Sequence, residues 1–276
     1  MYGRETTVKK LLKKGVNLEV VDKHGANALM LSLNNNHLKI ATLLINAGIS
    51  INSPDRKNRT ALMLAVAQGS LKLTKLLIKK GANVNAKDND KKTPMMIASE
   101  NGFIKIVEIL LNEQSQLDLR DRYGRSAWIF AADNKHLKLV KFLSEKEINN
   151  QKHLFYAVSH GLFGVVKILL NLNVNTEIQD SQGWTPLMWA ANNNLTKIVE
   201  ILLESGASIN GSNGKNSSIS GWTPLMLASG GGHLETVKLL VMNGADLGTL
   251  DNEKWSALTW ASLNGYSNVV SFLIEK

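Results

Sequence analysis

Apolar residues recur along the chain at helical spacing, in short blocks. Ile106-Val107 with Leu110-Leu111, and Ile198-Val199 with Leu202-Leu203, place apolar pairs four residues apart, as on one face of an α-helix. Shorter blocks begin after a Thr or Ser able to cap a helix, with Pro or Ala at the first helical position. Polar and apolar residues then alternate in extended stretches such as 82–85. The pattern predicts a short helix, a second helix and a hairpin-like finger.

This unit repeats. The stretch Gly-Trp-Thr-Pro-Leu-Met-Trp-Ala-Ala at 183–191 returns as Gly-Trp-Thr-Pro-Leu-Met-Leu-Ala-Ser at 221–229. Looser copies start at Asn27, Thr60, Thr93, Ser126 and Ser256, and most steps between neighbouring copies are 33 residues. A fixed period of this size is typical of a stack of identical supersecondary units, not of a globule around one core.

The repeats predict which residues are buried and where helices end. We expect the first helices to bury one position per repeat: Leu29, Leu62, Met95, Trp128, Leu154, Leu187, Leu225 and Leu258. Each first helix should end at a residue that tolerates a left-handed backbone. These residues are Asn36, Gly69, Gly102, Gly161, Asn194, Gly232 and Gly265, and Lys135 is the exception. Glycines 15, 48, 81, 206 and 244 stop second helices.

These motifs closely resemble the ankyrin repeat family, whose pattern is a turn Gly, TPLHxAA, GH, IVxxLL and GAxVN. The resemblance covers essentially the whole chain and implies an all-α repeat solenoid, a curved stack of helix–turn–helix repeats with hairpin-like fingers and a concave groove. We expect one domain over 1–276, with repeats at 1–21 (partial), 22–54, 55–87, 88–120, 121–147, 148–177, 178–210, 211–247 and 248–276.

The chain departs from the family pattern at several places. The family's TPLH histidine is replaced by Met30, Met63, Met96, Ile129, Phe155, Met188, Met226 and Thr259, so soft packing should replace its hydrogen bonds. The step from Ser126 to Lys152 is seven residues short, which predicts a missing or stunted finger. Five extra residues fall in the Gly/Ser/Asn-rich finger 211–221, which predicts a flexible lip. Because the first repeat has only its second helix and the last stops early, we expect a fragment of a longer protein.

Composition narrows the function. Residues 1–150 carry 25 Lys/Arg against 14 Asp/Glu, a net +11, while residues 151–276 carry 7 against 9, a net −2. A basic half favours acidic partners. There is no apolar run long enough to span a membrane and no signal peptide pattern, and cysteine is absent. We expect a cytoplasmic or nuclear protein; the sequence leaves the oligomeric state open, and a monomer is favoured.

Chemistry-bearing motifs are missing. The sequence has no P-loop, HExxH or dinucleotide-binding glycine pattern, so we expect no catalytic, cofactor-binding or metal-ligating residues and no cofactor. His37, His136 and His233 share one repeat position, where the resemblance implies that the ring ties the second helix to a finger backbone. His24, His153 and His160 are expected to be solvated.

Binding should fall on exposed positions of the stack that are free to vary. The residue just before the N-cap is Ala26, Arg59, Lys92, Arg125, Gln151, Trp184, Trp222 and Trp255 in successive repeats. Three cations are thus followed by three tryptophans. At a pitch of roughly 10 Å the tryptophans cannot stack on one another, but they can form a row of apolar ledges. Flanking candidates are Arg56, Lys57, Arg122 and Tyr123, then Asn192, Asn193, Asn264, Trp189 and Trp260.

The resulting hypothesis is a non-catalytic scaffold that binds a partner protein segment in its groove, apolar at one end and acidic at the other. Exposed Trp and Arg are common interface hot spots. An alternative for the tryptophans is that each merely covers a neighbouring finger. An alternative function is that the basic N-terminal half binds nucleic acid or an anionic membrane surface.

Overall fold

The structure is a computed structural model and describes residues 5–147, 151–213 and 221–276. Within these residues it contains 17 α-helices and no β-strand, apart from one isolated antiparallel bridge between Val21 and Asn27. The chain divides into two compact parts, which we call the N-terminal half (Met1–Leu143) and the C-terminal half (Ser144–Lys276). The predicted all-α repeat architecture is confirmed.

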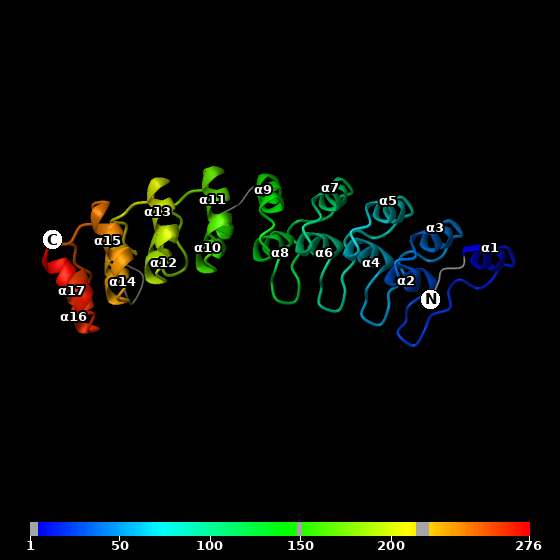
Figure 1. The fold of residues 1–276 in the computed structure, drawn as a ribbon, viewed down its shortest axis with the longest axis horizontal. Helices are drawn as coiled ribbons and strands as arrows, with labels where there is room; N and C mark the ends of the chain where they lie inside the picture. The colour runs from blue at the N-terminus through cyan, green and yellow to red at the C-terminus, as the bar shows by residue number, and fades with distance from the viewer. Residues whose placement is uncertain (1–4, 148–150, 214–220) are drawn as a thin grey trace. The chain divides into compact units, whose positions relative to one another are not determined.

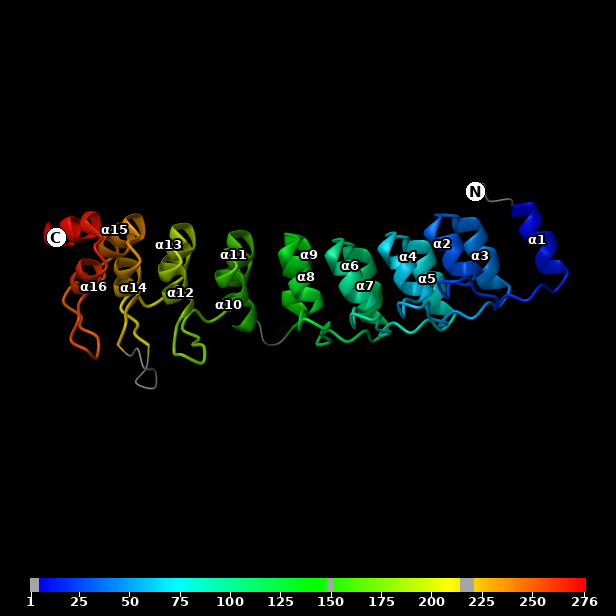
Figure 2. The ribbon, with the colours of Figure 1, turned by 90° about the horizontal axis from the view of Figure 1, so that it is seen from below.

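Helices alternate between two rows in each half (Figures 1 and 2). The first helices of the repeats are α2 (Ala28–Asn34), α4 (Ala61–Ala67), α6 (Pro94–Glu100), α8 (Ala127–Asp133), α10 (Gln151–Ser159), α12 (Pro186–Asn192), α14 (Pro224–Gly230) and α16 (Ala257–Leu263). The second helices are α1 (Glu5–Lys13), α3 (Leu38–Asn46), α5 (Leu71–Lys79), α7 (Ile104–Asn112), α9 (Leu137–Lys146), α11 (Phe163–Asn171), α13 (Thr196–Glu204), α15 (Leu234–Met242) and α17 (Ser267–Ile274).

Side-chain caps start the first helices as predicted. Asn27, Thr60, Thr93, Ser126, Thr185, Thr223 and Ser256 each accept a hydrogen bond from the main-chain N–H three residues on. The cap satisfies one of the donors that a helix N-terminus leaves without a partner. Each of these helices then begins at the residue after its cap, so the N-terminal boundary is set locally.

The predicted core positions are buried, with one exception. Leu29, Leu62, Met95, Trp128, Leu154, Leu187 and Leu225 are all at most 1% exposed, whereas Leu258 is half-buried on α16, which packs on α14 and α17. The methionines at the family's histidine position are buried, as expected for soft packing. Ile129 and Phe155 are half-buried and Thr259 is exposed.

The turn between the two helices of a repeat adopts the left-handed backbone region. The glycines and asparagines predicted to do so have positive φ, and Lys135 does as well, at φ 57°. We predicted that Lys135 would be the exception to this left-handed geometry, and this prediction was wrong. The turn imposes a positive φ on Lys135 as it does on Gly and Asn at the equivalent positions. A non-Gly residue in this region is strained by about 1–2 kcal/mol. The packing of the two helices on either side of the turn offsets this strain.

The fingers are tight turns closed by an aspartate. In the N-terminal half the main-chain N–H of Asp55, Asp88 and Asp121 donates to the carbonyl four residues later, at 3.0 to 3.1 Å. Neighbouring finger tips are also bonded, since Arg122 N donates to the Asp90 carbonyl at 2.8 Å. The loops extend beyond the first-helix row in Figure 1. They hold the residue before each N-cap at a fixed place beside its helix.

Two of the three equivalent histidines have a different role from the expected one. His136 Nε2 donates to the carbonyl of Glu100, and His233 Nε2 to that of Asn192, both at 2.9 Å. These acceptors are the last residues of α6 and α12. Each histidine ring therefore ties the second helix of its own repeat to the first helix of the repeat before it, and not to a finger. The expectation that His153 is solvated was also wrong, because the side chain is buried and its Nε2 lies 3.2 Å from Glu147.

Two expectations from repeat spacing concern segments that are not described. The core of the inserted lip, residues 214–220, and the point of the stunted finger, residues 148–150, lie outside the described residues. In the remainder of the chain no helix has the length and apolar character needed to cross a bilayer. No grouping of three or more His, Cys, Asp or Glu side chains suited to a metal occurs among those residues either.

The His136 contact predicts a difference between two glycine substitutions. Gly102 and Gly81 both have positive φ, at 70° and 86°, but a Cβ at Gly102 would lie 2.7 Å from His136 Nδ1 while one at Gly81 meets nothing within 4 Å. Both Gly→Ala variants carry the left-handed cost, so Gly102→Ala should lose about 1 kcal/mol more by displacing the ring from the Glu100 carbonyl. Urea unfolding measures the difference; equal losses would show that the ring contact contributes nothing.

Candidate functional site

The candidate surface is built around the finger aspartates. One carboxylate oxygen of each, Oδ1, accepts main-chain hydrogen bonds from the residues two and four positions later; in Asp121 these come from Tyr123 and Arg125, at 2.9 and 2.8 Å. The other carboxylate oxygen, Oδ2, is then free to accept a hydrogen bond from a side chain. The residue type of that donor differs between the two halves, and so do the side chains exposed beside the fingers.

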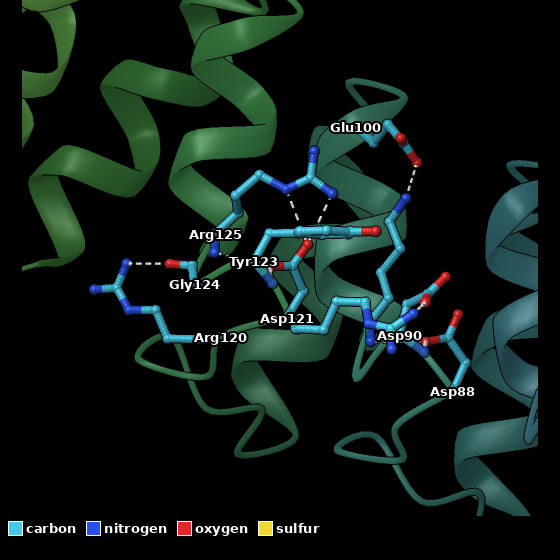
Figure 3. Close-up of polar contacts among 10 residues, drawn as sticks. Asp88, Asp90, Glu100, Arg120, Asp121, Tyr123, Gly124 and Arg125 are labelled. Atoms are coloured by element: carbon cyan, nitrogen blue, oxygen red, sulfur yellow. Dashed lines mark hydrogen bonds and ion pairs between the residues drawn. The ribbon is translucent and has the colours of Figure 1, made fainter.

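Arginine supplies the donor to two of the finger aspartates in the N-terminal half, Asp55 and Asp121. Arg59 Nε donates to Asp55 Oδ2 at 2.8 Å and its Nη2 lies 2.7 Å from the same oxygen. Arg125 repeats the pair with Asp121, at 2.9 and 2.8 Å (Figure 3). Both aspartates are buried while each arginine side chain keeps 39% of its surface exposed. The two guanidinium groups are therefore largely neutralised from within the fold.

Lys92 is paired differently. Its Nζ lies 2.5 Å from Glu100 Oε2 (Figure 3) and 4.5 Å from the centre of the Phe130 ring. Arg125 contacts the same ring, with Cζ 4.4 Å from the centroid. Two cations thus cover one buried phenylalanine of α8, which is a favourable cation–π arrangement. Each of the three cations before the N-caps, Arg59, Lys92 and Arg125, therefore has an intramolecular carboxylate partner.

The residues that flank this row are more exposed. Tyr123 at the finger tip is 71% exposed, and the guanidinium groups of Arg122 and Arg125 lie 5.9 and 5.2 Å from its ring centre. Arg122 also pairs with Asp90 at 2.8 Å, with both side chains more than half exposed (Figure 3). Arg56 is exposed and bonds the preceding finger through its main chain. A partner would meet Tyr123 and Arg56 first.

Hydrogen bonds lower the carboxyl pKa in these pairs against the opposing effect of burial. For Asp55 and Asp121 burial alone would raise the pKa, and this is the largest single influence on each. Hydrogen bonds from the side chain and main chain of Arg59 and Arg125 outweigh it, so that each pKa lies below the ordinary value of 3.8. The ion pairs therefore stabilise the ionised, folded form.

Tryptophan supplies the Oδ2 donor in the C-terminal half. The indole Nε1 of Trp189 donates to Asp180 at 2.8 Å, and that of Trp260 donates to Asp251 at 2.9 Å. Both tryptophans lie on first helices, nine residues after the aspartate. The signal in the sequence is an Asp followed at that interval by Trp, and the sequence interpretation placed these tryptophans only as flanking residues.

The finger tryptophans pack against these helix tryptophans. Trp184 lies 5.4 Å from Trp189 between ring centres, and Trp260 lies 4.4 Å from Trp222 and 4.9 Å from Trp255. All the ring pairs are tilted by 57 to 59°, within the range favoured by aromatic quadrupoles. Among the residues that the structure describes, each finger tryptophan packs on a helix tryptophan and not on another finger tryptophan. We define the aromatic patch as Trp184, Trp189, Trp222, Trp255 and Trp260.

The aromatic patch is half-buried and keeps polar groups free. Each of its five side chains is partly exposed, and in the described part of the chain the indole N–H groups of Trp184, Trp222 and Trp255 have no acceptor. Asn193 next to it uses its amide to cap the Trp189 carbonyl at 2.8 Å, and the Asn192 carbonyl is taken by His233. The patch offers apolar ring surface with unpaired donors at its edge.

Comparison with known proteins identifies the repeat. The family model for ankyrin repeats in three copies matches residues 1–88, 85–153, 147–213 and 210–276, which together span the chain. The chain belongs to the ankyrin repeat family. Ankyrin repeats commonly mediate protein–protein interaction and are typically non-enzymatic. A search of curated proteins gives no match to this ankyrin repeat chain.

The buried Asp121–Arg125 pair predicts a specific response to acid. Because the folded pKa of Asp121 is below the unfolded value of 3.8, the pair's contribution is fully present above that value and is lost as pH falls through the folded pKa. Asp121→Asn should cost about 1–3 kcal/mol at neutral pH, and its deficit relative to wild type should shrink as the pH falls below 3.8 and through the folded pKa. Urea unfolding at neutral pH and over a series of acidic pH values measures this.

The exposed Asp118 provides the control for net charge. Asp118→Asn removes the same charge from the same half without breaking an ion pair, and should leave stability within about 0.5 kcal/mol of wild type. If Asp121→Asn matched it at neutral pH, the pair would contribute no stability.

Proposed function

We propose that this ankyrin repeat chain is a protein-interaction module whose aromatic patch binds an extended segment of a partner protein. The observation that supports this most directly is the set of half-buried tryptophans with unpaired indole N–H groups. Trp184, Trp222 and Trp255 lie against a helix tryptophan, so their ring orientations are already ordered before a partner arrives. Pre-ordered aromatic surface loses little entropy on binding, and tryptophan is the residue most enriched in interface hot spots.

The partner segment should be extended because the ledges come from successive repeats. Each finger contributes one tryptophan and each repeat is displaced from the next by roughly a helix diameter. An extended chain places successive side chains and carbonyls along such a line. Its carbonyl groups are the natural acceptors for the free indole donors, while its apolar side chains cover the rings. We therefore favour a segment with apolar residues and accessible main-chain carbonyls.

The cationic row contributes less to this proposal than its charge suggests. Arg59, Lys92 and Arg125 each pair with a carboxylate of the same chain, so an acidic ligand would have to displace that carboxylate. Exchange of one carboxylate for another yields little net energy. Arg56, Arg122 and Tyr123 remain the more accessible contacts for an acidic end of the partner. The same pairing disfavours nucleic acid or an anionic membrane as the ligand of this row.

A display selection against the chain provides ligands for a test. Peptides selected from a random library are measured by fluorescence anisotropy against wild type, Trp184→Ala/Trp222→Ala and Met242→Ala. A loss of about 2 kcal/mol for each hot-spot tryptophan corresponds to an affinity about 30-fold weaker per tryptophan and roughly 1000-fold weaker for the double variant.

Met242 is the matched control because it is apolar, 81% exposed and in the same half, on a second helix. Met242→Ala should bind like wild type. Selected peptides that bind the tryptophan double variant as tightly as wild type, while circular dichroism shows it folded, would contradict the proposed function.

A further inference from the structure

Two clusters in different halves of the chain occupy the same repeat positions. Each has a finger aspartate, the residue before the N-cap four positions later, and an aromatic residue of the first helix nine positions later. The fourth member is the residue before the N-cap of the preceding repeat. The members are Asp121, Arg125, Phe130 and Lys92 in the N-terminal half, and Asp251, Trp255, Trp260 and Trp222 in the C-terminal half. We call the second set the tryptophan cluster.

In the N-terminal cluster, two cations lie on an aromatic ring beside a buried carboxylate. Arg125 Cζ is 4.4 Å and Lys92 Nζ is 4.5 Å from the centre of the Phe130 ring. The Arg125 guanidinium also pairs with Asp121 Oδ2, through Nε at 2.9 Å and Nη2 at 2.8 Å (Figure 3). This repeat therefore contains a position where one cation both covers an aromatic ring and pairs with a buried carboxylate.

The tryptophan cluster has the carboxylate and the rings but a different set of donors. Asp251 is 5% exposed. Its oxygens accept from the main-chain N–H groups of Glu253 and Trp255 and from the indole N–H of Trp260, which are all neutral. Among the described residues Asp251 has no ion pair, and Glu253 and Lys254 on the same finger are exposed and opposite in sign. Buried charges in proteins are normally paired, so the missing group is a cation.

The rings of the tryptophan cluster offer surface for such a cation. Trp260 lies 4.4 Å from Trp222 and 4.9 Å from Trp255 between ring centres, and the two ring pairs are tilted by 59° and 57°. All three side chains are half-buried, whereas Phe130 is only 2% exposed beneath its two cations. Indole attracts cations more strongly than the other aromatic side chains do, and the nearby carboxylate adds to that attraction.

The same donor set occurs at another finger of the C-terminal half. Asp180 accepts from the indole N–H of Trp189 at 2.8 Å and from the main-chain N–H groups of Gln182 and Trp184. It also has no ion pair in the part of the chain that the structure describes. Residues 151–276 carry a net charge of −2, which favours a basic ligand over an acidic one. A finger carboxylate bonded to neutral donors is therefore not confined to one repeat.

We propose that the tryptophan cluster binds an arginine side chain of the partner segment. This inference rests on the proposed function, since it names the residue that the segment brings to the aromatic patch. The guanidinium lies on the indole surface as Arg125 lies on Phe130, and Asp251 supplies the complementary charge. Arginine suits the cluster better than lysine, because its planar group is weakly hydrated and stacks on aromatic faces.

Replacing arginine by citrulline tests the charge. Citrulline has nearly the shape of arginine but is neutral. Peptides from the display selection should contain an arginine, and its change to citrulline should weaken binding by about tenfold at low salt, as expected for a partly desolvated cation–π contact. Fluorescence anisotropy measures both affinities. Added salt should narrow the difference, because it screens the attraction of the carboxylate.

Substitutions at Trp255 locate the cation. Trp255→Arg places a guanidinium four residues after Asp251, which is the spacing of the Arg125–Asp121 pair. This variant supplies its own cation, so it should stay folded by circular dichroism and bind the arginine and citrulline peptides equally. Trp255→Phe keeps an aromatic ring and should preserve the preference for arginine.

Glu204→Gln is the control for net charge. Glu204 is exposed at the end of α13, a second helix of the same half. Its substitution removes a negative charge without touching the tryptophan cluster, and should leave the preference for arginine unchanged.

Two results would overturn the inference. Selected peptides that lose affinity for Trp184→Ala/Trp222→Ala, yet show no preference for arginine over citrulline, would exclude the cation and leave the proposed function standing. A preference for arginine that Trp255→Arg leaves unchanged would place the cation elsewhere on the chain. Peptides that bind Trp184→Ala/Trp222→Ala as tightly as wild type contradict the proposed function itself, and this inference with it.

Discussion

A helix of two turns is not stable alone in water, so each short helix of this protein depends on its neighbours for stability. Seven of the described first helices have only seven residues, well below the length at which isolated helices become stable. Each is held by a cap at its start and by neighbouring helices packed against it. Stability therefore passes from repeat to neighbouring repeat. Leu258 on α16 is half-buried, whereas its seven equivalents in the other repeats are at most 1% exposed.

The finger aspartate is the second element on which the surface depends. Its Oδ1 accepts the main-chain hydrogen bonds that close the finger turn, and in Asp55, Asp121, Asp180 and Asp251 its Oδ2 accepts from a side chain. Arg59 and Arg125 do this in one half and Trp189 and Trp260 in the other. The identity of this donor determines what the surface exposes. Where an arginine before the N-cap donates to the carboxylate, its charge is paired within the fold. Where a tryptophan on the first helix donates instead, the residue before the N-cap is a second tryptophan, and the two rings pack together.

Much of the candidate site could be located from sequence, but its chemistry could not. Repeat spacing identified Arg59, Lys92, Arg125, Trp184, Trp222 and Trp255 as equivalent variable positions, and the structure shows them beside the fingers. What the spacing could not show is that the three cations have carboxylate partners within the fold. It also placed Trp189 and Trp260 at the edge of the aromatic row, whereas each is the ring against which finger tryptophans pack. These are contacts between side chains from different elements, which a linear pattern does not encode.

The sequence by itself determined the repeat, the helix boundaries and the buried positions, because these follow from local rules. A Thr cap bonds its own helix three residues on, a left-handed turn falls between the helices whether Gly or Lys135 occupies it, and an apolar residue recurring at fixed spacing faces the neighbouring repeat. Only the tertiary structure decided which side chain donates to each aspartate, which carbonyl accepts from His136, and that His37 Nε2 has no partner among the described residues. His136 and its acceptor Glu100 lie 36 residues apart, so their pairing depends on how one repeat packs on the next.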